Sequence, residues 1–174
     1  MLHGVSPDGG QYMPLFPYEF YAGMKPEHAV DLFEYIRQSA PKSDRASEPH
    51  SMLLTRRIFG KNPWRFSFEP ATYSGAGDNE RDALAWGKYL TDSVAACGAC
   101  HTPRNSAFIL QADQVHRGGI SPMGEVAGDI SRDTISALGL DGFHAAMAAG
   151  TGLDGATKLK GTMATVAAQL AAAD

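Results

Sequence analysis

The chain carries the pentapeptide Cys97-Gly98-Ala99-Cys100-His101, in which two thiols stand three positions apart and an imidazole follows directly. This CxxCH spacing lets the two thiols add across the vinyl groups of a haem while the adjacent imidazole reaches the iron. The sequence contains no cysteine besides these two. The motif therefore predicts one covalently bound haem c, attached through Cys97 and Cys100, with His101 as the iron ligand.

The same thiols have three other interpretations, which are a thioredoxin-type dithiol, half of a zinc site and a buried disulfide. A zinc site needs two further ligands at close spacing, and the sequence has no second CxxC and no HxxxH. A redox dithiol is expected just after a strand, at the start of a helix, whereas a helical pattern leads into Cys97. The sequence therefore favours haem attachment.

Apolar residues recur at helical spacing along much of the chain, and this periodicity predicts an all-α fold. Pro26 suits a first helical turn, and Gly150 is typical of a helix end. A short helix around 52–59 and an alternating aromatic stretch at 64–68 are further predictions. The main helices are predicted at 26–38, at 81–95, at 134–149 and from residue 163 onward.

The chain divides into three predicted parts. A polar, charged segment begins at Pro41, and the stretch Gly75-Ala76-Gly77-Asp78 interrupts the pattern before the helix that enters the motif. We therefore expect a first region at 1–40, a linker at 41–79, and a haem-binding domain at 80–174.

A sixth iron ligand is expected from a soft or imidazole donor after the motif. Met147 lies in the middle of a predicted helix, where core packing explains it. Met163 follows a Gly-punctuated loop that would let the backbone lie against a flat macrocycle, so it is the better candidate, although it could also simply anchor the last helix. Met123 is a reserve candidate, and His144 a more distant one.

Composition argues against several function classes. The 19 acidic and 15 basic residues give a formal charge of −4, without a basic run of the kind that nucleic-acid binding requires. No stretch approaches the roughly 20 apolar residues that cross a bilayer. The first residues lack the features of a secretory signal, so we expect that a signal was removed or that upstream sequence is absent.

A family resemblance becomes specific around the motif. The runs Trp86-Gly87-Lys88-Tyr89-Leu90 and Cys100-His101-Thr102-Pro103-Arg104-Asn105 resemble the second haem domain of bacterial periplasmic multihaem (dihaem-type) cytochromes c. These include the cytochrome subunits of membrane-bound alcohol and sugar-acid dehydrogenases. In that family a Gly-x-Met segment supplies the axial thioether, and Gly161-Thr162-Met163 matches it. The resemblance implies a cytochrome c-like lobe with Met163 on the iron.

The beginning of the chain resembles the closing half of a preceding haem domain, so residues 1–40 are expected to form a partial cytochrome c-like lobe. The CxxCH of that domain would fall before Met1, and most of the last helix of the second domain would fall after Asp174. We therefore expect a fragment truncated at both ends, with no haem in the first region.

The resemblance also assigns roles to two residues after the motif. The Pro103 carbonyl resembles the group that accepts the imidazole N–H in class I cytochromes and so fixes the orientation of the ring. Arg104 is a candidate for contact with the haem propionates, although polar residues after a turn are often simply solvated. Both are predicted to be cofactor-binding residues.

The function implied by the resemblance is electron transfer, with no catalytic residue in this chain. Electrons would come from a periplasmic dehydrogenase and pass to the respiratory chain, through a terminal oxidase or a quinone-linked complex. The implied location is the periplasm, where only a partner would attach the chain to a membrane. Two alternatives are a peroxidase-like haem enzyme with an open sixth position, and a haemless module whose thiols form a disulfide.

Overall fold

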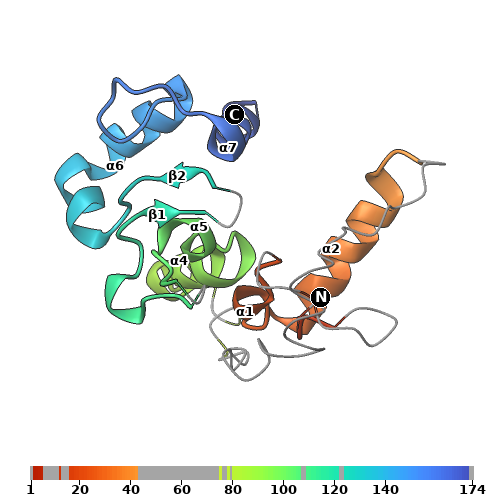
Figure 1. Ribbon diagram of the computed structural model, residues 1–174. Helices are drawn as coiled ribbons and strands as arrows, with labels where there is room; N and C mark the ends of the chain where they lie inside the picture. The colour runs from red at the N-terminus through yellow and green to blue at the C-terminus, as the bar shows by residue number, and fades with distance from the viewer. Residues whose placement is uncertain are drawn as a thin grey trace. The chain divides into compact units, whose positions relative to one another are not determined.

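The computed structural model describes residues 2–5, 12, 16–42, 75, 78, 80–106, 109–121 and 124–172 (Figure 1). Contacts divide the chain into two compact units, Met1–Gly98 and Ala99–Asp174. The predicted boundary near residue 80 stays a prediction, because it depends on the neighbouring linker, most of which lies outside the described residues. The helix predicted at 52–59 and the aromatic stretch at 64–68 also lie outside them.

The described part of the first unit is helical. The predicted helix at 26–38 is confirmed as α2, and Pro26 occupies its first turn. The predicted helix at 81–95 is confirmed with one difference, because its second half is a π-helical turn. The elements are α1 (Tyr18–Tyr21), α2 (Pro26–Ser39), α4 (Ala83–Tyr89) and the π-helix η3 (Leu90–Val94).

Buried Tyr89 joins α2 to the helix that precedes the motif. Its hydroxyl oxygen accepts from the Lys25 backbone N–H at 3.1 Å and is hydrogen-bonded to Nδ1 of His28 at 2.7 Å. The Trp86 and Tyr89 rings lie 5.3 Å apart between centroids. Since Tyr89 is only 1% exposed, these contacts fix the start of the segment that leads to the cysteines.

Helix α1 packs against η3, the element that directly precedes the motif. A Cβ at Gly23 would lie 2.6 Å from the Ser93 side-chain oxygen, so a larger residue would force the Ser93 side chain to move. The π-helix then ends with the Cys97 N–H donating to the Thr91 carbonyl at 2.9 Å. The backbone is thus hydrogen-bonded up to the first cysteine.

The second unit contains two longer helices and a small β-ribbon (Figure 1). Gly150 ends the predicted helix at 134–149 in the left-handed conformation, as expected of a C-terminal glycine. The ribbon was not predicted from the sequence. The elements after the motif are the 3-10 helix η4 (Ala112–Gln114), β1 (Gly119–Ile120), β2 (Val126–Ala127), α6 (Arg132–Ala149) and α7 (Gly161–Ala171).

The ribbon is antiparallel, with Gly119 opposite Ala127 and Ile120 opposite Val126. Helix α6 bends at Gly139, where φ is 73° and the backbone leaves helical geometry. Helices α6 and α7 contact each other after the loop that connects them. The second unit therefore contains both this helical pair and the ribbon.

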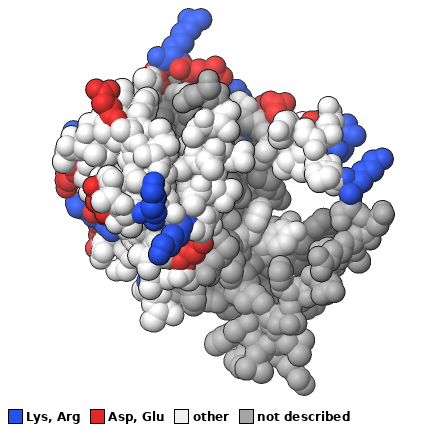
Figure 2. Space-filling view, turned by 90° about the horizontal axis from the view of Figure 1, so that it is seen from above, with Lys and Arg blue, Asp and Glu red and all other residues white. Residues whose placement is uncertain are grey.

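On the face shown in Figure 2, acidic and basic side chains are interspersed, and no large field of one sign is visible among the described residues. Within the described residues, no helix is long and apolar enough to cross a bilayer.

Candidate haem-binding site

The motif lies at the short helix α5 (Gly98–His101), which begins one residue after Cys97. Cys97 and Cys100 are both half-buried, and no disulfide joins them in the structure. His101 is 8% exposed, and Ala99 is 7% exposed. The motif therefore presents two unlinked sulfurs and one buried imidazole.

The His101 ring is held by a carbonyl on the segment that follows β2. Its Nδ1 lies 2.8 Å from the carbonyl oxygen of Gly128. A carbonyl oxygen only accepts, so Nδ1 must carry the proton and Nε2 must carry the lone pair. This is the tautomer that an iron-ligating histidine needs, with its second nitrogen oriented by a hydrogen bond.

Further hydrogen bonds keep the His101 segment in place. The His101 carbonyl accepts from the Gly118 N–H at 2.8 Å, and the Thr102 side-chain oxygen accepts from the His116 N–H at 3.1 Å. Thr102 is 3% exposed. The imidazole is thus oriented by both the ribbon and the loop before it.

The predicted role of the Pro103 carbonyl is wrong. That carbonyl accepts from the Gln111 N–H at 2.9 Å, whereas Gly128 accepts from the imidazole. The physical reason is that the loop after the motif closes on Pro103, while the ribbon brings Gly128 to the ring. Gly119 lies against Pro103, since a Cβ there would be 3.0 Å from the Pro103 Cα. Direct contact of Pro103 with a cofactor stays a prediction.

Two opposite charges act on the second thiol of the motif. Burial raises the pKa of Cys100 above its ordinary value, the Glu125 carboxylate raises it further, and the Arg104 guanidinium lowers it. Arg104 is half-buried and pairs its backbone with Leu110 in an isolated bridge. A fixed positive charge beside the thiol suits the propionates of a haem, and that role of Arg104 stays a prediction.

These charges should control the reactivity of Cys100 in haem-free protein, because the thiolate is the nucleophile. Glu125→Gln removes a charge that raises the thiol pKa, so we expect faster alkylation of Cys100 by iodoacetamide at pH 8. Arg104→Gln removes a charge that lowers the pKa, so we expect slower alkylation. Peptide mass spectrometry at timed points measures both rates, and two variants that shift the rate in the same direction would contradict this electrostatic picture.

Met163 occupies the first turn of α7 and is half-buried. Hydrogen bonds within the second unit connect the His101 imidazole to the residue before Met163. Gly128 holds His101, and Glu125, three residues before Gly128, accepts hydrogen bonds from Thr162. An extended strand advances about 3.3 Å per residue, so the segment between these contacts spans about 10 Å. His101 and Met163 therefore belong to one hydrogen-bonded framework.

The other ligand candidates have different surroundings. Met147 is half-buried on α6, and His144 is exposed on the same helix. Met123 lies outside the described residues. Within those residues, no group of three or more His, Cys, Asp or Glu side chains is placed to hold a metal ion.

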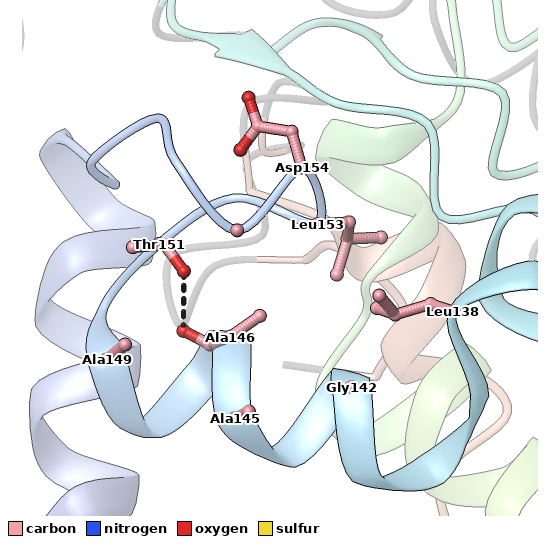
Figure 3. Close-up of a pocket in the computed structure, with 9 residues that line it drawn as sticks. Leu138, Gly142, Ala145, Ala146, Ala149, Thr151, Leu153 and Asp154 are labelled. Carbon is pink, nitrogen blue, oxygen red and sulfur yellow. Dashed lines mark hydrogen bonds between the residues drawn. The ribbon is translucent and has the colours of Figure 1, made fainter.

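A pocket of about 380 Å³ lies between α6 and the loop that leads to α7 (Figure 3). Its volume is within the range of small-molecule sites. The α6 wall is built from small residues, and the Thr151 hydroxyl donates to the Ala146 carbonyl at 3.3 Å across its end. The pocket was not predicted from the sequence. The sequence feature that could have indicated it is the recurrence of small residues along α6, at Gly142, Ala145, Ala146 and Ala149.

No family model matches the chain, but it resembles several curated proteins. It is 34% identical over 125 residues to the diheme cytochrome c-type protein of Cereibacter sphaeroides, covering 70% of this chain and 41% of that protein. It is 31% identical over 118 residues to the fructose dehydrogenase cytochrome subunit of Gluconobacter japonicus, covering 64% and 23% respectively. It is 30% identical over 151 residues to the gluconate 2-dehydrogenase cytochrome c subunit of Pantoea cypripedii, covering 79% and 33%. The chain is a homologue of these cytochromes c.

This cytochrome c homologue spans less than half the length of each of these three relatives. Its helical architecture and its relatives confirm the predicted all-α, cytochrome c-like fold class. None of the three names describes a peroxidase.

The residues of this cytochrome c homologue fit a covalent haem. Two unlinked thiols precede a buried imidazole whose Nδ1 is hydrogen-bonded, which leaves Nε2 as the donor. Cys97 and Cys100 would hold the porphyrin, and His101 would hold the iron. The relatives' names support a haem c.

Proposed function

We propose that this chain transfers electrons through one haem c, which Cys97 and Cys100 would bind covalently and whose iron His101 and Met163 would hold. The observation that carries the proposal is the hydrogen bond from the His101 imidazole to the Gly128 carbonyl, directly after the paired thiols. That bond sets the tautomer an iron ligand needs. The names of the relatives, which are cytochrome subunits, support the same function.

Each residue has a defined task in this proposal. A bound haem supplies the one-electron chemistry of its iron. The Gly128 carbonyl orients the His101 ring and makes it a stronger donor. Met163 would supply a thioether, which favours the reduced state relative to a second imidazole. Arg104 would neutralise a propionate, and Pro103 would contact the cofactor.

The electron donor in this proposal is a dehydrogenase. Two of the relatives are named as cytochrome subunits of fructose and gluconate dehydrogenases, and this supports a partner of the same kind. Substrate oxidation would then take place on the partner, and this chain would pass the electrons to the respiratory chain, through a terminal oxidase or a quinone-linked complex. The location proposed for it is the periplasm.

Peptide mass spectrometry tests the proposal directly. Protein purified from a host that matures c-type cytochromes should be red, and the peptide containing Cys97 and Cys100 should carry the mass of haem. A Cys97→Ala, Cys100→Ala double variant provides the control, because it removes both attachment points and should lose the covalent haem. Colourless wild-type protein with both thiols free would refute the electron-transfer proposal.

A further inference from the structure

The side chain of Glu125 reaches the first turn of α7 from a segment 37 residues earlier in the chain. Its Oε1 accepts from the Thr162 backbone N–H at 3.2 Å, and its Oε2 accepts from the Thr162 hydroxyl at 2.8 Å. Lys160, at the N-cap position, makes no side-chain capping bond. Glu125 therefore acts as a cap for α7, and its charge suits the positive end of the helix.

Gly161 leaves the space that the carboxylate occupies. A Cβ at this position would lie 1.8 Å from Oε1 of Glu125, so a larger residue would displace the carboxylate. The φ of Gly161 is +53°, in the left-handed region that glycine adopts without strain. The glycine thus allows Glu125 to approach the helix start closely.

The segment that carries Glu125 also contacts the motif. Glu125 directly precedes β2, and Gly128, which binds the His101 ring, directly follows it. One short strand segment thus contacts both the imidazole side of the site and the helix that carries Met163.

We infer that Glu125 is a positioning residue that holds Met163 for the iron by fixing the first turn of α7. The inference rests on the proposed function. Met163 directly follows Thr162, whose N–H and hydroxyl both bind Glu125. Without these bonds, the turn loses two hydrogen bonds to the segment before β2, and Met163 is held less firmly.

The experiment uses the haem-loaded full chain and four variants. Glu125→Ala removes both hydrogen bonds and the charge, whereas Glu125→Gln keeps an amide oxygen that can accept from Thr162. Asp141→Ala is the matched control, because it removes an exposed carboxylate from α6 in the same unit. Met163→Ala shows the signature of complete loss of the thioether. Carbon monoxide binding to the reduced protein reports an open iron position.

We expect Glu125→Ala to raise the rate of carbon monoxide binding roughly tenfold, the effect of losing one or two charged hydrogen bonds. Its methionine-to-iron absorption band should weaken. Glu125→Gln should stay near wild type in carbon monoxide binding, since the conservative change restores the contact, while its reduction potential rises because a negative charge is gone. Asp141→Ala should behave as wild type in all these measurements.

The outcomes separate this inference from the proposed function. Wild-type protein without haem would overturn both. Haem-loaded Met163→Ala that binds carbon monoxide no faster than wild type would refute the ligand assignment and this inference, and leave haem attachment intact. If Met163→Ala binds carbon monoxide but Glu125→Ala stays like wild type, the positioning role alone is wrong. An equal rise in Glu125→Ala and Asp141→Ala would also overturn it, because it would indicate general destabilisation.

Discussion

His101→Ala protein should carry roughly 100-fold less covalent haem than wild type when both are produced in a host that matures c-type cytochromes. Loss of an outer partner alone costs a metal site 10- to 100-fold, and this variant loses the ligand itself. The buried imidazole is the donor that the motif offers, with Nδ1 engaged by Gly128 and Nε2 left to bind. Without it, the two thiols remain but the iron has no donor from the motif.

Absorbance of the purified protein and the mass of its Cys97–Cys100 peptide measure the loss. His144→Ala is the matched control, because this histidine is exposed on α6 and should retain full haem content. If the His101 variant is as red as wild type and carries haem on both thiols, another side chain must supply the axial imidazole. If His144→Ala loses its haem instead, the distant candidate is the ligand.

The motif and the longer helices could be predicted from sequence because their signals are local. CxxCH is five consecutive residues, and the pattern in 26–38 repeats over a helix that the structure confirms as α2. Gly150 marked the end of α6 correctly, because a left-handed C-terminal residue favours glycine. The π-turn in η3 was missed, since its apolar spacing differs little from that of an α-helix over five residues.

The partner of the imidazole could not be predicted, because it lies 27 residues away and depends on two strands of two residues each. Strands of that length show no alternation that a sequence pattern could reveal. The prediction therefore chose Pro103, the nearest carbonyl suggested by the family. The bond between Glu125 and Thr162 is equally non-local, spanning 37 positions, and a lone glutamate gives no sign of it in the sequence.

Met163→Ala should convert a haem-loaded protein that resists carbon monoxide into one that binds it when reduced. Its reduction potential should fall by on the order of 0.1 V or more, because a thioether ligand raises the potential and axial ligands span about 0.8 V across haem proteins. Met163 is the expected ligand because it is half-buried in the first turn of α7 and directly follows Thr162, which Glu125 binds. Reduced-minus-oxidised spectra and a redox titration measure both changes.

Met147→Ala is the control for the loss of a methionine, since Met147 is half-buried on α6 and is predicted to pack in the core. It should lower the melting temperature without opening the iron to carbon monoxide. If Met147→Ala opens the iron and Met163→Ala does not, the two assignments are reversed. Wild-type protein that already binds carbon monoxide would have an open sixth position, which is the requirement of the peroxidase-like alternative and not of a six-coordinate electron carrier.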